Sequence, residues 1–451
     1  MDLNILIVGG GIHGIGLMHD LASRQIPGVH LVEKKFLASG TSSRSTKLFH
    51  GGLRYLEHFN QWGLVREALH ERTLFLKLLK GLVHPMPFVL PHFKNSARPA
   101  FLVRSGLFFY DLLSGDGGLP PAQSIQKENI LTYAPYLNEH KVKHEIQSAF
   151  LYYDAQMLDD VIARLAAHAS LKLGATFEEQ SEVTAIQKTD EGFKVTIQNA
   201  SGVKTLSTKY VVNAGGAWSN ANLLKWGYVP KVTCLLNLGT HLVFKPEVSP
   251  QSQVNNCSAT LIQEPDGRVV FFIPWQGKWL LGTTESILSS DPSQLHYPEE
   301  DKRYLMNVAQ TYLNLTNAEE NIDEIFCGVR CMPLDKRLPI KNTWHDAWAT
   351  DPYSSPFYVR HLDKNISGLS RETVIEENAD GIYSIYGGKW TTYRSVSEEL
   401  GTKLSRKLRL GRRSGTHLPE NWFLQQLMEE KPEIFVSSKE LRRDLNLKNT
   451  F

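Results

Sequence analysis

Residues 3–14 read LNILIVGGGIHG, a short apolar run that is followed at once by spaced glycines. An apolar run of this length predicts a strand that is covered on both faces. A helix is expected over residues 12–24, and residues 29–32 predict a second strand that ends at Glu33. Strand, glycines, helix and strand thus come in the order of a βαβ unit.

The three glycines of the pattern Gly-x-Gly-x-x-Gly each have a physical role. Gly9 permits a tight turn, Gly11 lets the backbone approach a pyrophosphate, and Gly14 lets the helix pack close to the strand. Backbone N–H groups at the start of the helix would then face the phosphates. Glu33 stands where a carboxylate can accept hydrogen bonds from ribose hydroxyls. A chance turn is the alternative, but the order of the elements favours a dinucleotide site, without separating NAD from FAD.

The bulk composition is that of an ordinary globular protein. The chain has 451 residues, of which 42% are hydrophobic and 21% charged, and this length favours two domains. The formal net charge of +2 provides no long-range field for nucleic acid, so none is expected as a partner. Four cysteines are too few for a disulfide framework and are interpreted as buried thiols in a reducing cytoplasm. Neither a spanning helix nor a metal site is predicted.

Residues 41–58, TSSRSTKLFHGGLRYLEH, indicate which dinucleotide binds. The segment combines hydroxyls, cations and paired glycines directly behind the βαβ unit. A nicotinamide domain has little use for such a loop. A flavin site does, because the diphosphate, ribitol and isoalloxazine need many short donors and close backbone contact. The alternative is a polar loop that caps a helix.

The same segment resembles the signature of FAD-dependent glycerol-3-phosphate dehydrogenases, within the D-amino-acid-oxidase-like flavoprotein superfamily. The resemblance continues in separate segments to about residue 400. These are residues 98–100, 106–111, 153–155, 158–160, 210–218, 272–275, 282–285, 327–330 and 385–394. In the last of them a strand, a glycine turn and a helix start follow one another. A helix N-terminus near flavin N1 and O2 would stabilise the reduced flavin.

The resemblance implies an α/β plus α+β fold, in which a Rossmann-like FAD-binding domain is interleaved with a mainly antiparallel-sheet substrate domain. The FAD-binding domain is then expected to collect three separate stretches of chain. The expected limits are residues 1–80, 149–228 and 366–405 for the FAD-binding domain, 81–148 and 229–365 for the substrate domain, and 406–451 for a shortened C-terminal helical tail.

The resemblance also implies that FAD binds noncovalently. The expected contacts come from the glycine turn, the acid after it, the polar loop, a strand beside the adenine, the end of a later strand and the glycine–lysine turn. They are Gly9, Gly11, Ile12, His13, Gly14, Glu33, Lys34, Thr41, Ser42, Ser43, Thr46, Lys47, Leu48, His50, Gly51, Gly52, Val183, Ala214, Gly215, Trp218, Gly388, Lys389, Trp390, Thr391 and Thr392.

The implied reaction is the oxidation of sn-glycerol 3-phosphate to dihydroxyacetone phosphate, with hydride transfer to flavin N5. A base must take the hydroxyl proton, and His241 is the candidate because neutral imidazole suits that role near neutral pH. Cations must hold the phosphate dianion, and Arg330 and Arg54 are the candidates. The ordinary alternatives are a solvated or capped histidine and a surface ion pair.

Three further side chains complete the site that the resemblance implies. Tyr55 would add a hydrogen bond to the substrate, and Arg371 would provide a further cation. Lys389 would lie beside the flavin, where it orients the substrate and stabilises developing charge.

Three features depart from the family pattern, and one is that Cys331-Met332-Pro333 follows Arg330 in place of an immediate proline. About fifty residues follow the Lys389 motif where the family has a sizeable helical C-terminal domain, and Leu238 stands where dehydrogenases often carry a lysine. The substrate could therefore differ from the family's. A second hypothesis keeps the fold but makes the chain an oxidase of an amine or another hydroxy acid. A third is a non-catalytic flavin-binding protein, and the oligomeric state is left open.

The family's dehydrogenases pass electrons to a quinone in the membrane, and the same acceptor is expected here. Residues 94–113 carry Lys94, Arg98 and Arg104 among large apolar side chains, which suits a helix at a membrane surface. Packing inside the substrate domain is the alternative. The basic residues 403–413 would favour an anionic membrane, with a solvated helix as the alternative. The expected location is cytoplasmic, with peripheral attachment to the inner face of the cell membrane left open.

Overall fold

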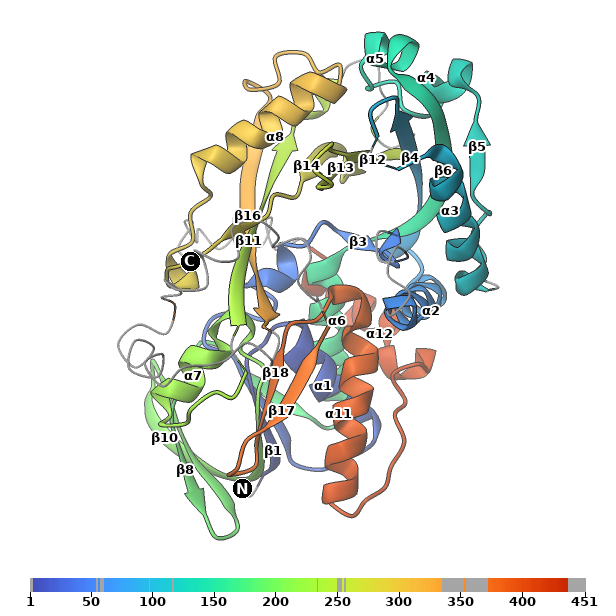
Figure 1. Ribbon diagram of the computed structural model, residues 1–451. Coiled ribbons are helices and arrows are strands. Elements are labelled where there is room, and N and C mark those ends of the chain that lie inside the picture. The colour runs from blue at the N-terminus through green and yellow to red at the C-terminus, as the bar shows by residue number, and fades with distance from the viewer. Residues whose placement is uncertain are drawn as a thin grey trace.

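Two sheets, one above the other in Figure 1, form the framework of the computed structural model. The structure describes residues 3–53, 56, 61–96, 98–115, 117–232, 234–249, 254, 257–334, 353 and 372–436. The chain passes repeatedly between the two sheets, so neither sheet comes from one continuous stretch.

The lower sheet has a parallel core. β1 pairs in parallel with β10 on one side and β2 on the other, and β18 and β7 extend the sheet in parallel. β17 adds an antiparallel edge, and the β8–β9 hairpin pairs antiparallel with β10. The strands are β1 (Leu3–Val8), β2 (Val29–Val32), β7 (Thr176–Glu178), β8 (Glu182–Thr189), β9 (Gly192–Asn199), β10 (Gly202–Asn213), β17 (Val374–Glu377) and β18 (Ile382–Tyr386). Val8 lies opposite both Val32 and Asn213, so three strands end together where the glycine turn begins.

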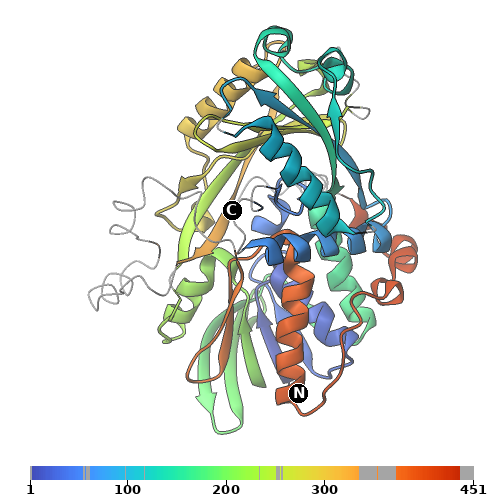
Figure 2. The same ribbon diagram turned by 45° about the vertical axis from the view of Figure 1, so that its right-hand side comes forward.

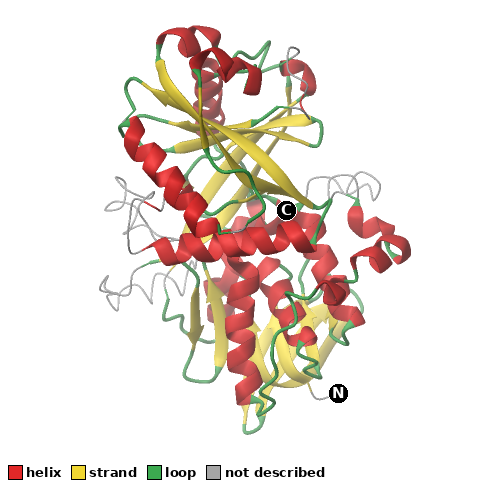
Figure 3. Cartoon of the chain, turned by 90° about the vertical axis from the view of Figure 1, so that its right-hand side faces the viewer, coloured by secondary structure: helices red, strands yellow, loops and turns green. Residues whose placement is uncertain are grey.

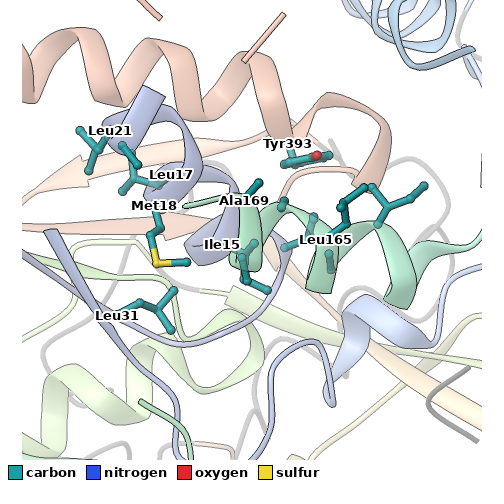
Figure 4. Packing of buried hydrophobic residues seen from close by; sticks show 14 of the residues in the cluster. Ile15, Leu17, Met18, Leu21, Leu31, Leu165, Ala169 and Tyr393 are labelled. Atoms are coloured by element: carbon teal, nitrogen blue, oxygen red, sulfur yellow. The ribbon is translucent and has the colours of Figure 1, made fainter. Parts of the chain in front are cut away.

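Helices cover the near side of the lower sheet in Figure 3. α1 (Ile12–Ser23) packs against both α6 (Asp159–Lys172) and α11 (Tyr393–Lys407). Figure 4 shows the core they share, in which Ile15 of α1 lies near Leu165 of α6. A Cβ on Gly16 would lie 2.5 Å from the Tyr393 ring, so this glycine lets α1 and α11 approach closely.

The upper sheet is antiparallel except where β12 meets β4. Its strands are β3 (Leu48–Phe49), β4 (Val83–Phe93), β5 (Gln123–Ile125), β6 (Ile146–Met157), β11 (Cys234–Phe244), β12 (Ala259–Gln263), β13 (Val269–Trp275), β14 (Lys278–Gly282), β15 (Ser286–Ile287) and β16 (Ile322–Pro333). The helices that lie between these strands in the sequence are α2 (Trp62–Leu78), α3 (Ala100–Ser114), α4 (Ile130–Tyr133), α5 (Glu139–His144) and α8 (Glu299–Tyr312). A further helix, α7 (Ser219–Lys225), packs on the lower sheet.

The two sheets confirm the predicted interleaved fold. The lower sheet takes strands from residues 3–32, 176–213 and 374–386, and the upper sheet takes strands from the stretches between them. β6 of the upper sheet runs across the limit expected at residue 148. The domain limits themselves stay a prediction.

The described part of the C-terminal segment packs against the helices of the lower sheet. Trp422 is buried in the same core as α1, and His19 Nε2 lies 2.9 Å from Asn421 O. α12 (Leu424–Glu430) contacts α6, and Figure 2 shows this red segment beside the body of the molecule. The described part of this segment therefore folds onto the body that carries the glycine turn.

The four cysteines are free thiols. Cys327 is buried, as expected, but Cys234, Cys257 and Cys331 are half-buried. Cys331 is accessible because its strand, β16, passes along the cavity described below.

Candidate active site

A cavity of about 830 Å³ lies where the two sheets meet. Its lower wall comes from the carboxyl ends of β1, β2 and β10 and the turns that follow them. Its upper wall comes from β6, β12, β13 and β16. The carboxyl ends of parallel strands are where open α/β sheets bind their ligands, and pockets of roughly 300–1,000 Å³ are usual for small molecules and cofactors.

The glycine turn forms one end of the cavity because only glycine fits its backbone. Gly9 has a φ of +113°, and a Cβ there would lie 2.6 Å from Ala214 O. A Cβ on Gly14 would lie 1.9 Å from Gly9 O, so Gly14 lets the helix pack directly against the turn. The turn thus presents bare main chain to the cavity, which suits the close approach of a pyrophosphate.

Glu33 is held at the cavity wall by two main-chain donors. Its Oε2 accepts from Gly10 N–H at 2.6 Å and its Oε1 from Lys35 N–H at 2.7 Å. Burial raises the pKa of Glu33, and these two amides oppose the rise. A carboxylate has about four lone-pair sites, so two remain for ribose hydroxyls.

The polar loop joins segments that lie far apart in the sequence. Ser42 Oγ accepts from Ile12 N–H at 2.8 Å, and Trp390 Nε1 donates to Ser42 O at 3.0 Å. Thr41 Oγ1 donates to Val329 O at 2.7 Å. The glycine turn, the polar loop, β16 and the start of α11 therefore meet around one cavity.

Most residues expected to contact FAD line this cavity. They are Gly9, Gly11, Ile12, His13, Glu33, Lys34, Thr41, Ser42, Thr46, Leu48, His50, Gly52, Val183, Ala214, Gly215, Trp218, Gly388, Lys389, Trp390 and Thr391. The remaining ones, which do not line it, are Gly14, Ser43, Lys47, Gly51 and Thr392. The expected substrate residues Arg54, Tyr55 and Arg371 lie outside the described residues.

Lys47 faces away from the cavity, into the protein. Its Nζ lies 2.9 Å from Asp159 Oδ1 and donates to Ser43 O at 2.6 Å. Both side chains of the ion pair are at most 5% exposed. The charge of Lys47 is therefore matched inside the protein, where it fixes the polar loop against α6.

Arg330 of β16 lines the cavity and is held from the side by two polar groups. Its Nη1 donates to Asn237 Oδ1 at 3.2 Å, and its Nη2 lies 3.5 Å from Thr283 Oγ1. Gly239 leaves room for this side chain, because a Cβ there would lie 3.1 Å from Arg330 Nη2. Lys389 follows β18 of the lower sheet and lines the same cavity.

His241 of β11 is 1% exposed and is not part of the cavity wall. Its Nε2 lies 3.1 Å from the hydroxyl of Thr46, which does line the cavity. Its ring stacks on Phe326 at 4.8 Å. Burial, and then the charges of Arg330 and Lys47, hold the pKa of His241 well below its usual range. The imidazole is therefore neutral near pH 7, and Thr46 separates it from the cavity.

The sequence analysis missed the residues that position Arg330. Asn237 is fully buried and faces Arg330 across the β11–β16 pair. Thr283 falls in residues 282–285, which the family resemblance had singled out without giving them a role. No local pattern marks Asn237, because its partner lies 93 residues away.

The fold and the cavity are those of a dinucleotide-binding protein. The glycine turn lines one part of the cavity, and the cations Arg330 and Lys389 line another part. Residues 4–356 match the family of FAD dependent oxidoreductases, so the chain belongs to that family. A solved glycerol-3-phosphate dehydrogenase from Bacillus halodurans superposes with a TM-score of 0.68, covering 98% of this chain and 74% of that one at 22% identity. That likeness concerns the fold.

Three curated relatives are 30–32% identical to this chain over the aligned residues. The mitochondrial glycerol-3-phosphate dehydrogenase of Macaca fascicularis is 32% identical over 88% of this chain and 52% of its own length. The glycerol-3-phosphate dehydrogenase of Pseudomonas aeruginosa is 30% identical over 89% and 71%. The D-erythritol 1-phosphate dehydrogenase of Brucella abortus is 31% identical over 88% and 72%. The chain thus spans about half the length of the mitochondrial relative.

Proposed function

We propose that the chain oxidises sn-glycerol 3-phosphate to dihydroxyacetone phosphate with FAD bound in this cavity. The observation that carries the proposal is that Arg330 and Lys389, which come from different sheets, line the same cavity as the glycine turn. Two cations beside a dinucleotide site suit a small phosphorylated substrate. The names of the relatives point to the same substrate class.

The residues of the cavity fit FAD. The bare main chain at Gly9 suits the diphosphate, and Glu33 suits a ribose. The N-terminal end of α11, with Trp390 and Thr391 in the wall, would favour negative charge on a reduced flavin. When bound, FAD would supply the hydride acceptor.

Arg330 would bind the substrate phosphate. Asn237 and Thr283 hold the guanidinium from one side and so fix its place in the cavity wall, where a planar cation suits a phosphate. Lys389 would add a second positive charge from the opposite sheet. Arg54, Tyr55 and Arg371 remain further proposals for the same pocket.

His241 would receive the hydroxyl proton through Thr46. The Thr46 hydroxyl can donate to Nε2 of a neutral imidazole while it accepts a hydrogen bond from a group in the cavity. The low pKa of His241 keeps this acceptor free of protons, but it also makes the imidazole a weak base. Proton transfer would therefore become favourable only as the hydride leaves and the substrate hydroxyl becomes acidic.

A second candidate substrate is a longer polyol phosphate, since one relative is named for D-erythritol 1-phosphate. It has the same phosphate group, so the cations serve both. An oxidase of an amine or another hydroxy acid, and a non-catalytic flavin-binding protein, remain the alternatives. The non-catalytic alternative gives Arg330 and Lys389 no shared role, and an acid substrate would use them for a carboxylate in place of a phosphate.

Turnover of purified holoprotein with a dye acceptor tests this proposal. We expect activity with glycerol 3-phosphate, weaker activity with erythritol 1-phosphate, and very little with glycerol or glycine. Arg330→Gln should lower kcat/KM for glycerol 3-phosphate by roughly 10- to 100-fold, because it removes a charge-assisted contact to the phosphate. Equal activity on glycerol and glycerol 3-phosphate would contradict the proposal, and preference for glycine would favour the oxidase alternative.

We further propose that a membrane quinone accepts the electrons and that α3 faces the membrane. On this helix Phe101 is 71% exposed, and Phe108 and Leu112 are each 64% exposed. Arg104 lies exposed on the same helix, which suits an anionic lipid surface. Within the described ranges, no helix combines the length and apolarity needed to cross a bilayer. With Phe101 and Phe108 facing outward, helix α3 would lie on the surface of the membrane.

Cosedimentation with anionic phospholipid vesicles tests the role of α3. The double variant Phe101→Ser, Phe108→Ser should bind at least tenfold more weakly, because each buried Phe contributes about 1.5–3 kcal/mol. Val203→Ser is the matched control, since Val203 is 67% exposed on β10. Equal binding by the double variant and the control would exclude α3 as the docking helix.

A further inference from the structure

Tyr110 on the inner side of α3 belongs to a network of buried hydrogen bonds that joins four segments of the chain. The Oη accepts from Gly51 N–H at 2.7 Å and donates to Asp154 Oδ1 at 2.7 Å. Arg72 Nη1 donates to the same Oδ1 at 2.7 Å, and Arg72 Nη2 donates to Ser114 Oγ at 2.6 Å. The polar loop, α2, α3 and β6 thus share one buried network.

This network is charged although it is buried. Arg72 and Asp154 are 2% and 3% exposed. Hydrogen bonds to Asp154 and Ser114 offset the burial of Arg72 Nη1 and Nη2, while Arg72 Nε has no hydrogen-bond partner among the described residues. Burial raises the pKa of Asp154, and Arg72 and Tyr110 oppose the rise. Burial and the Asp154 charge raise the pKa of Tyr110 well above its ordinary value. The hydroxyl therefore keeps its proton for Asp154 and offers a lone pair to Gly51.

The network ends at the wall of the cavity. Asp154 lines the cavity, as do His50 and Gly52 on either side of Gly51. A Cβ on Gly51 would lie 2.8 Å from Tyr110 Cε2 and 2.6 Å from Leu69 Cδ2, so the main chain is pressed against the tyrosine ring. Tyr110 itself does not line the cavity.

We propose that Tyr110 is a positioning residue for the redox reaction, which holds the main chain of residues 50–52 in place as a wall of the cavity. This inference rests on the proposed function. Tyr110 acts through Gly51, without touching substrate or cofactor. Tyr110 comes from residues 106–111 and Asp154 from residues 153–155, two of the segments that carry the family resemblance.

Tyr110→Phe removes the hydroxyl and keeps the ring. Tyr136→Phe is the matched control, because Tyr136 is also fully buried and its hydroxyl also has two partners, Ser258 O at 2.6 Å and Thr260 Oγ1 at 2.8 Å. Tyr136 is not part of the cavity wall. Both variants lose a buried hydroxyl and should lose stability in thermal unfolding, Tyr110→Phe more than Tyr136→Phe because only Tyr110 donates to a carboxylate.

Two measurements distinguish a positioning role of Tyr110 from a general loss of protein stability. Amide hydrogen exchange of the peptide that contains Gly51 should become at least tenfold faster in Tyr110→Phe and stay unchanged in Tyr136→Phe. With FAD saturating, Tyr110→Phe should lower kcat/KM for glycerol 3-phosphate by roughly tenfold, which corresponds to one lost hydrogen bond. Unchanged exchange, or equal kinetics in the two variants, would overturn the proposal.

The exchange measurement keeps the inference separate from the proposed function. If the unmutated protein does not oxidise glycerol 3-phosphate, the function fails, and exchange at residues 50–52 still decides the role of Tyr110. If Tyr110→Phe does not fold, Ser114→Ala takes its place, because Ser114 holds Arg72 beside the Asp154 oxygen to which the Tyr110 hydroxyl donates. Faster exchange at residues 50–52 in Ser114→Ala supports the proposal, and unchanged exchange overturns it.

Discussion

Gly239 sets the space available to Arg330, and Gly239→Ala tests this directly. The added Cβ would lie 2.5 Å from Thr283 Oγ1 and 3.1 Å from Arg330 Nη2. Ordinary contact begins near 3.4 Å, so the Thr283 hydroxyl must move by about 0.9 Å and the guanidinium by about 0.3 Å. Displacement should weaken the contact between Arg330 and the phosphate.

The expected loss follows from the strength of such contacts. Hydrogen bonds to charged groups are worth about 1.5–3 kcal/mol, so a substantial misplacement should raise KM for glycerol 3-phosphate by roughly 10- to 100-fold. FAD binding should change little, because the residues that the new Cβ would meet, Thr283, Arg330 and Thr284, are not among the expected FAD contacts. Overpacking itself should cost about 1–3 kcal/mol of stability.

Steady-state kinetics with a dye acceptor, together with the flavin content from the visible spectrum, measure these effects. Gly63→Ala in α2 is the control, because a Cβ there has no neighbour within 4 Å. If Gly239→Ala keeps the KM of the Gly63→Ala control while its FAD content stays the same, Arg330 does not bind the substrate in the way proposed.

Three further changes have separate readouts. Gly14→Ala should give protein without bound FAD in its visible spectrum, because the Cβ would collide with main-chain Gly9 O; normal flavin content would contradict this account. Lys47→Met should lower the free energy of unfolding in urea by about 3–5 kcal/mol, since it leaves Asp159 buried without its cation; a loss below 1 kcal/mol would mean that the pair is not buried in solution. Burial lowers the pKa of His19 to about 4, below its unfolded value near 6.5, so stability should fall by about 1.4 kcal/mol per pH unit as the pH drops from 6.5 toward 4. His19→Gln should remove that part of the pH dependence, and an unchanged slope would show that His19 is not buried.

The parts of the fold that depend on local sequence could be predicted. The glycine turn could be predicted from spacing, because the closest contact at Gly14 is with Gly9 of the same βαβ unit. The close approach of Ala214 to Gly9 comes from the end of β10, and the spacing of the glycines does not report it. That Gly388 and Lys389 lie in the cavity wall was predicted only from the resemblance to a family. This part of the wall could not be placed by local rules, since it contacts the polar loop across 348 residues, from Trp390 to Ser42.

The direction of individual side chains could not be predicted in the same way. Lys47 lies between two cavity-lining residues, Thr46 and Leu48, but its partner Asp159 is 112 residues away and turns it inward. His241 stands behind Thr46 because β11 packs its ring against Phe326 of β16. Both outcomes depend on tertiary packing, which no periodicity in the sequence reports.

The central claim is that FAD in this cavity is reduced by glycerol 3-phosphate, and an anaerobic visible spectrum of the purified protein tests it most directly. We expect oxidised flavin bands that bleach when glycerol 3-phosphate is added, with one dihydroxyacetone phosphate formed for each flavin reduced. Bands that persist would contradict the substrate assignment. The absence of flavin bands even after FAD is added would contradict the account of the cavity itself.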